Sequence, residues 1–300
     1  MIVYLDQNKW IELARMFHGK DMSSRASRVL RDFNAARAVA RVKLPLSSVH
    51  YIETSRVSNV DRKVRLGAAM WYFSRGETLL GYQAIVRYEL EVALAGHLPQ
   101  VNPGSINIMG NGHAHAFCSP PLQGVLARFA ENVERSMLMG NERLGIKPLA
   151  SYSAIHRENF RQHLSTLHAR YKEVPKDLRE NWLYAMSTID ILNPINDVIK
   201  KHSLPKEALY ELGEKGLKQV VDDMPTRRVD LHLHRQVLSN PNYVARISDL
   251  EDWGGLVVAS CYCDVLVCEK HMADMLRRDG LTTHARIETN LESAFGTKGA

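Results

Sequence analysis

The sequence predicts an α/β fold in which a short parallel sheet is built from both ends of the chain and a large helical insertion lies between them. The chain opens on the apolar run 2–5, which lacks polar alternation, as expected of a strand buried on both faces of a parallel sheet. A similar run, 265–268, lies near the other end. Helical patterns dominate from about residue 60 to residue 245. We therefore expect one domain from residues 1–59 and 246–300, and a mostly helical insertion over residues 60–245.

The first elements follow from spacing and capping signals. A helix is expected directly after Asp6, because Trp10, Ile11 and Leu13 recur near helical spacing. A second helix is expected from about residue 23 to 42, with a short strand at 44–46. Ser47 or Ser48 then begins a helix that carries Glu53 one to two turns further on.

Proline and glycine divide the remainder of the chain into segments. Helices are expected at roughly 61–74, 82–96, 121–140, 154–172, 177–201, 206–222 and 227–238. Residues 105–117, which include Asn111-Gly112, suit a small β-hairpin or an ordered loop. The α/β pattern then returns with a helix over 248–262, the strand 265–268, a helix over 269–278 and a weak strand near 285–287.

Composition excludes several classes of protein. With 45% hydrophobic and 24% charged residues, the chain of 300 residues is typical of a globular protein. It has no apolar run near the ~20 residues of a membrane span and no secretory signal pattern, so we expect a cytoplasmic protein that does not bind membranes. The net charge of +6 is compatible with a polyanionic partner.

Acidic residues gather at the ends of the predicted strands and in the helices beside them: Asp6, Glu53, Asp249, Asp252, Asp264 and Glu269. Carboxylates brought together repel each other, and they either bind protons or recruit a hard cation. Mg²⁺ and Mn²⁺ prefer oxygen ligands, and such a site activates water for attack on a phosphodiester. Asn8 and Ser47 are expected to orient these ligands through hydrogen bonds, without contacting the metal themselves. Any one of these acids alone is more simply a helix cap or a surface residue, and Asp249 and Asp264 suit a cap and a turn.

These segments also carry a family resemblance. Val-Tyr-Leu-Asp6-x-Asn8 resembles the first motif of PIN-domain nucleases, and Leu-Pro-Leu-Ser-Ser followed by Glu53 resembles their second strand and second acid. The run from Asp249 through Asp252, then Asp264-Val-Leu-Val-Cys-Glu269, is similar to their third acidic helix and the strand after it. The match covers about residues 1–57 and 246–295. The family pattern has an acid where this chain has Lys270.

The resemblance implies a PIN-like three-layer α/β/α domain and a metal-dependent ribonuclease. Asp6, Glu53, Asp252 and one of Asp264 or Glu269 would hold Mg²⁺ or Mn²⁺, with Asp249 a further ligand candidate. RNA is the expected substrate rather than DNA, and the biological role would be that of a toxin, a defence effector or a processing enzyme. The helical insertion would select substrate, form a homo-oligomer or bind a regulator protein.

Two other hypotheses stay open. Lys270 is compatible with a catalytically degenerate PIN-like module that binds nucleic acid or serves as a scaffold. The segments Arg157 to His163 and Arg227 to His232 resemble the Arg-x(4–6)-His motif of HEPN ribonucleases, which are helical and independent of metal. His113 and His115, after Asn111-Gly112, suit a polar loop tip or a contact with substrate.

Overall fold

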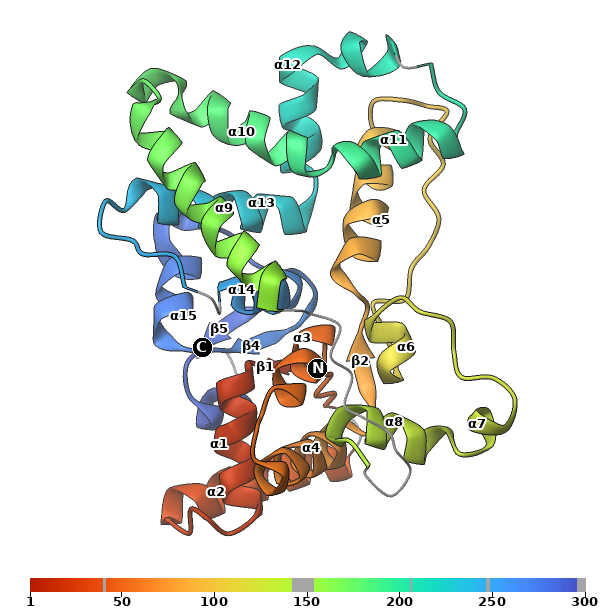
Figure 1. Ribbon diagram of the computed structural model, residues 1–300, viewed down its shortest axis with the longest axis vertical. Helices are drawn as coiled ribbons and strands as arrows, with labels where there is room; N and C mark the ends of the chain where they lie inside the picture. Colours follow the sequence, from red (N-terminus) through yellow and green to blue (C-terminus); the bar gives the residue numbers. More distant parts are fainter. Residues whose placement is uncertain (40–41, 142–153, 206, 247–248, 296–300) are drawn as a thin grey trace. The chain divides into compact units, whose positions relative to one another are not determined.

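The computed structural model describes residues 1–39, 42–141, 154–205, 207–246 and 249–295. Helices predominate, and a small parallel sheet gives the chain a general α/β architecture (Figure 1). Two compact units are present. The first comprises Met1–Gly81, Ile108–Arg157 and Leu250–Ala300, and the second comprises Tyr82–Asn107 and Glu158–Asp249.

The sheet of the first unit joins the two ends of the chain. Strands β1 (Val3–Leu5), β4 (Val265–Val267) and β5 (Arg286–Glu288) are parallel and lie in the order β1-β4-β5. Tyr4 lies opposite Leu266 in the register. The parallel pairing expected of runs 2–5 and 265–268 is therefore confirmed.

Residues 43–46 extend the hydrogen bonding on the other side of β1. The amide of Val3 donates to the carbonyl of Lys43 (2.8 Å), and the amide of Leu79 in β2 (Glu77–Leu79) donates to the carbonyl of Leu46 (2.7 Å). Strand β2 pairs in antiparallel fashion with β3 (Met109–Asn111). The sequence did not reveal β2, because three residues carry no periodic signal and their partners lie far away in the chain. Residues 105–117 consequently form no hairpin of their own.

Both faces of the sheet are covered by helices. Val3 and Leu5 pack on one face against α1 (Gln7–Phe17), α2 (Ser24–Ala38) and α4 (Val60–Ser74), in a core that includes Trp10 and Phe73. On the opposite face, Gly255 of α14 (Asp249–Tyr262) approaches the Tyr4 hydroxyl so closely that an added Cβ would lie 2.5 Å from it. A glycine is required at this point.

The remaining elements of the first unit are mostly short helices. They are α3 (Ser48–Ser55), α6 (Gly112–Ala116), α7 (Val125–Arg128), α8 (Ala130–Met139), α15 (Lys270–Arg277), and the 3₁₀ turns Arg278–Gly280 and Leu291–Ser293. Helices α4 and α8 were expected in the insertion. They lie in the first unit because Met70 and Leu138 belong to the same apolar core as Leu5.

The described residues of the second unit form helices and connecting loops, with no strand among them. Its helices are α5 (Tyr82–Ala95), most of α9 (Ala154–Glu173), α10 (Arg179–Asp190), α11 (Leu192–Lys201), α12 (Glu207–Asp222) and α13 (Pro225–Ser239), with a 3₁₀ turn at Lys176–Leu178. Leu90 and Leu94 of α5 pack against Ile195 and Val198 of α11. Across the described parts of the chain, no helix has the length and apolar character of a membrane span.

Candidate active site

Asp6 and Glu269 lie together at the carboxyl edge of the parallel sheet. Asp6 directly follows β1 and is the N-cap of α1, and Glu269 closely follows β4 and is the N-cap of α15. Because β1 and β4 are parallel neighbours, both acids leave the sheet at the same edge. The amide of Asp6 donates to the carbonyl of Val267 (2.9 Å), and the backbone amides of Gln7 and Glu269 lie close to the Asp6 carboxylate.

The electrostatics of Asp6 are unusual for a carboxylate. Burial raises the pKa of Asp6 to about 6, and the negative charge of Glu269 adds to this shift. The two backbone amides and the Lys9 ammonium oppose it without cancelling it. An ionised Asp6 is therefore poorly stabilised by its surroundings, and a cation at this edge would relieve that cost.

Asn8 holds the second acid in place. Its Nδ2 donates to Oε1 of Glu269 at 2.7 Å. Asn8 was expected to orient the acidic residues or a metal-bound water, and the structure places its amide on Glu269. The exposed Glu269 side chain thereby gains one fixed oxygen, while no described residue donates to the other.

The Tyr4 hydroxyl lies within electrostatic reach of both Asp6 and Glu53. The buried Tyr4 hydroxyl and Ser47 Oγ are hydrogen-bonded at 2.9 Å. Burial raises the pKa of Tyr4 well above its ordinary value, and the negative charges of Asp6 and Glu53 raise it further. Both carboxylates therefore lie within electrostatic reach of one hydroxyl, and Glu53 itself is half-buried on α3.

His50 fixes the end of β1 and was missed by sequence reasoning. The Ser47 amide donates to His50 Nδ1 (2.9 Å), so Nε2 carries the proton and donates to the carbonyl of Leu5 (2.9 Å), the residue before Asp6. Burial lowers the pKa of His50 to about 4, which keeps the ring neutral and preserves this arrangement at neutral pH. A capping-box position three residues after Ser47 was the only signal in the sequence.

The third acidic helix is α14. Its first residue is Asp249, and position 252 lies one turn before Gly255, which contacts Tyr4. The side chains of Asp249 and Asp252 lie outside the described residues.

Asp264, one of the acids expected to bind metal, lies apart from Asp6 and Glu269. It precedes β4 and therefore lies at the amino edge of the sheet, ~10 Å of strand away from Glu269. Its Oδ2 accepts from the amide of Ile2 (2.6 Å), and its Oδ1 lies 3.6 Å from Nε2 of His284. Asp264 anchors the start of the chain, and Glu269 is the acid that reaches Asp6.

Lys270 points along its own helix, where its ammonium pairs with Asp274 Oδ2 at 2.8 Å. Within the described residues, no group of three or more His, Cys, Asp or Glu side chains is arranged to hold a metal ion. The acids that the described structure gathers are thus Asp6 and Glu269, with Glu53 near Tyr4.

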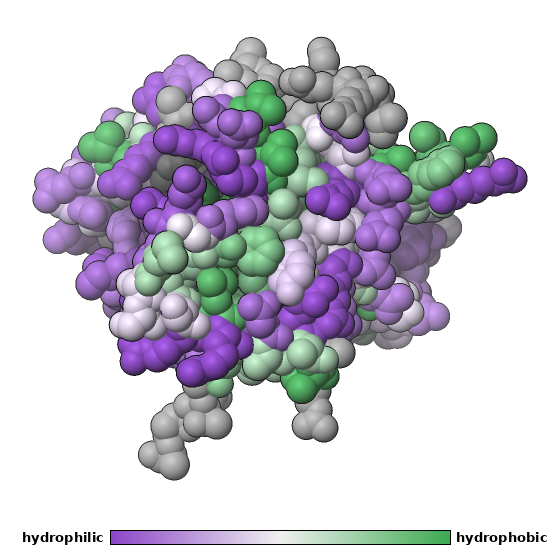
Figure 2. All heavy atoms as spheres, turned by 90° about the horizontal axis from the view of Figure 1, so that it is seen from below, coloured by the Kyte–Doolittle hydropathy of each residue, from purple (hydrophilic) through white to green (hydrophobic). Residues whose placement is uncertain are grey.

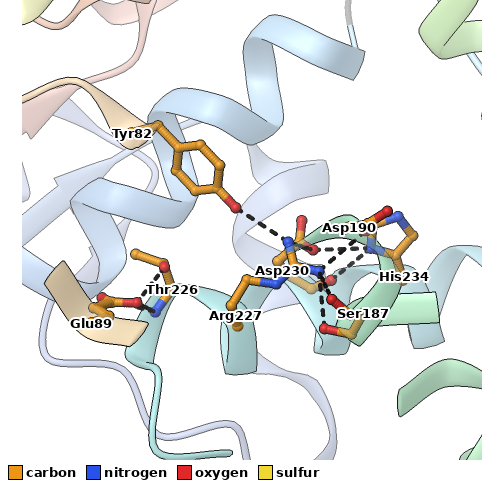
Figure 3. Close-up of polar contacts among 8 residues, drawn as sticks. All are labelled: Tyr82, Glu89, Ser187, Asp190, Thr226, Arg227, Asp230 and His234. Carbon is orange, nitrogen blue, oxygen red and sulfur yellow. Dashed lines mark hydrogen bonds and ion pairs between the residues drawn. The ribbon is translucent and has the colours of Figure 1, made fainter. Parts of the chain in front are cut away.

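One of the two segments proposed for metal-independent cleavage, Arg227 to His232, lies in the interior of the second unit, whereas His163 of the other segment is exposed on α9. The side chains of Arg227, His232 and His234 on α13 are all buried. Arg227 pairs with Asp230 (3.0 Å) and Asp190 (3.2 Å), and His234 Nδ1 lies 3.4 Å from Asp230 Oδ2, as Figure 3 shows. The guanidinium is enclosed by these partners and by Ser187 and Tyr82, so it is unavailable to an RNA strand.

His113 is not an exposed loop tip, as had been expected. It is buried on α6, where its Nδ1 lies 2.9 Å from Glu134 Oε1. His115 Nδ1 lies 3.0 Å from Thr78 Oγ1. Both rings tie α6 to neighbouring elements and serve packing.

Comparison of the chain with protein-family models, with curated protein sequences and with solved structures finds no match.

Proposed function

We propose that this chain is a PIN-like nuclease that depends on Mg²⁺ or Mn²⁺ and cleaves RNA in preference to DNA. The observation that carries the proposal is the meeting of Asp6 and Glu269 at the carboxyl edge of a parallel sheet formed by both chain ends. This is the edge at which parallel α/β folds place their ligands. Helices on both faces of that sheet also support the three-layer arrangement that the resemblance implies.

The donor set fits a hard divalent cation. The carboxylates of Asp6 and Glu269 supply oxygen ligands. Burial and the negative charge of Glu269 raise the pKa of Asp6, and the positive charge of Lys9 does not cancel this effect. The ion would be held by Asp6, Glu53, Asp252 and Glu269. Asp249 is a further candidate ligand. When bound, the ion would activate water and neutralise charge at the phosphodiester.

The chain's own residues would prepare this site. The neutral His50 ring fixes the Leu5 carbonyl and so sets the exit of the chain towards Asp6. Asn8 restrains one oxygen of Glu269 and leaves the other for a ligand. Ser47 holds the Tyr4 hydroxyl, around which α14 packs through Gly255. These contacts limit the motion of the acids before substrate arrives.

A scaffold or binding module is the second candidate. It is favoured by the lack of a three-ligand group among the described residues and by the pairing of Lys270 with Asp274. In that case the sheet edge would bind nucleic acid without hydrolysis. We further propose that the protein acts in the cytoplasm as a toxin, defence effector or processing enzyme, with the second unit serving a homo-oligomer or a regulator protein.

Asp6→Asn separates these functions. The substitution keeps size and hydrogen bonding but removes the charge that a cation needs, so cleavage of RNA should fall by ~10²-fold or more. EDTA should abolish RNA cleavage by the wild type, and added Mn²⁺ should restore that cleavage. Binding without cleavage by the wild type in Mg²⁺ and Mn²⁺ would favour the scaffold. Cleavage that survives both EDTA and Asp6→Asn, but is lost in His163→Ala, would favour the metal-independent ribonuclease.

A further inference from the structure

A basic groove lies in the first unit, between the end of α1 and the start of α4. Its charged lining consists of Arg15, Lys20, Arg62 and Arg65, and its cavity volume is about 740 Å³. Val57 and Leu66 contribute to an apolar floor, and His18 is tied to the carbonyl of Arg65 (2.9 Å). Among the residues that the structure describes, no carboxylate lines this basic groove.

The four cations of the basic groove are not neutralised by nearby acids. None of them forms an ion pair within 4.0 Å with a carboxylate of the described residues, and all four side chains are exposed. Arg15 is near the half-buried Asp21, whose carboxylate also accepts from the Ser23 amide. Arg25, by contrast, is fully engaged by Glu12 and Glu292. Unpaired charges of one sign around a hollow favour an anionic ligand.

The basic groove continues towards the candidate active site. A second hollow of about 570 Å³ shares Ile11, Arg15 and Lys20 with it and is also lined by Asn8. Asn8, Ile11 and Arg15 recur at helical spacing on one face of α1, so Asn8 and Arg15 are ~10 Å apart along the axis. Asn8 in turn bonds to Glu269.

Two acids line the second hollow, and cations lie beside both of them. The Glu12 carboxylate is held by Arg25 at 2.7 Å and by Lys9 at 3.6 Å, and the charges of Arg25 and Arg15 act on the Asp21 carboxylate. These cations reduce the repulsion that a polyanion passing along α1 would meet. Figure 2 views the molecule from the side of α2 and α4, where hydrophilic residues alternate with groups of apolar ones.

We infer that the basic groove binds the sugar–phosphate backbone of a single nucleic-acid strand and leads it to Asp6 and Glu269. This inference rests on the proposed function. Arg62 and Arg65 line the first hollow, and Arg15 and Lys20 line both hollows, so the cations extend over two adjoining hollows, which suits successive phosphates better than one small anion. The apolar floor would take the sugars, so the contact would be independent of sequence.

The test is binding of a labelled single-stranded RNA to Asp6→Asn protein over a range of salt concentrations. In the groove variant, Arg15→Gln, Lys20→Gln, Arg62→Gln and Arg65→Gln are combined. Each lost phosphate contact flattens the plot of log affinity against log salt by ~0.7, so the slope should change by ~3 and affinity at low salt should fall at least ~10-fold. A control of equal charge combines Arg31→Gln, Arg128→Gln, Lys215→Gln and Arg278→Gln, which are exposed and outside both hollows.

The outcomes separate the groove from the nuclease. If the groove variant shows the same salt slope and the same affinity for RNA as the control variant, the basic groove does not bind RNA. This conclusion holds whether or not the wild type cleaves RNA. A loss of binding confined to vesicles of anionic lipid, with RNA binding unchanged, also overturns it. Loss of RNA binding in a protein that never cleaves would support the groove and reject the nuclease.

A kinetic arm uses substrate length. On a long RNA, the groove variant with native Asp6 should show a raised KM and an unchanged kcat, since the groove positions the strand away from the chemistry. On a dinucleotide that does not reach Arg15, the groove variant and the wild type should be equal. A loss of kcat on both substrates would contradict the assignment, because it would place these residues in the site itself. Thermal unfolding of each variant checks that the fold is retained.

Discussion

Asn8 donates a hydrogen bond to Glu269 across 261 residues of chain, with Nδ2 and Oε1 2.7 Å apart. The bond joins the first helix to the last long helix at the point where two parallel strands end. It fixes the exposed Glu269 carboxylate beside the half-buried Asp6.

Asn8→Ala should weaken the site without changing its ligands. Removal of a residue that orients a metal ligand costs ~10- to 100-fold in affinity or activity, so the Mg²⁺ concentration for half-maximal cleavage should rise. A titration of cleavage with Mg²⁺ measures this. Asn8→Asp should do worse, because it sets a like charge against Glu269. An unchanged Mg²⁺ requirement in Asn8→Ala would show that the bond serves packing alone.

Asp6 should make the metal-free protein less stable as pH rises. Its pKa is about 6 in the folded chain against 3.8 as the ordinary value, so the folded state binds more protons than the unfolded state between these values. The free energy of unfolding should therefore decrease from about pH 4 to pH 6, by ~3 kcal/mol from this group. Urea unfolding in EDTA at pH 4 and pH 7.5 tests it.

Asp6→Asn is the matched variant for this measurement. In EDTA, its free energy of unfolding should exceed that of the wild type at pH 7.5 and equal it at pH 4. Added Mg²⁺ should reduce the difference between the two proteins at pH 7.5. A variant less stable than the wild type at pH 7.5 would mean that the amides of Gln7 and Glu269 outweigh burial.

Asp264→Ala should affect stability and spare cleavage. The side chain accepts from the Ile2 amide at the edge of the sheet remote from Glu269, so its loss removes one hydrogen bond worth ~1 kcal/mol. Cleavage at a temperature where both proteins are folded should stay within about twofold. If Asp264→Ala lowers the cleavage rate as much as Glu269→Gln does, Asp264 is part of the active site.

Two adjacent glycines of α14 should respond differently to the same change. Gly255→Ala places a methyl group 2.5 Å from the Tyr4 hydroxyl and should cost ~1–3 kcal/mol, with disturbance of the Tyr4–Ser47 bond. In Gly254→Ala the methyl group meets only Val49 at 3.9 Å, and higher helix propensity should stabilise by up to ~1 kcal/mol. Chemical unfolding compares the pair. Equal effects would place α14 further from Tyr4.

Most of the helices and the pairing of the two chain ends could be predicted from local pattern. An apolar run without alternation indicates a strand covered on both faces, and β1 and β4 are such strands. The acid after each run was visible for the same reason, because the residue after a parallel strand lies at the ligand-binding edge. Strand β2 was not visible, since three residues paired to a distant segment leave no periodicity.

The sequence by itself determined the strand ends at Asp6 and Glu269 and the helices between them, because these depend on spacing and capping within a few residues. Tertiary structure decided between Asp264 and Glu269, because the parallel pairing of β1 with β4 places Glu269, and not Asp264, at the edge that carries Asp6. It also decided the protonation of His50 and the raised pKa of Asp6, which depend on burial by segments remote in the chain. Burial and strand direction are long-range properties, and no window of neighbouring residues encodes them.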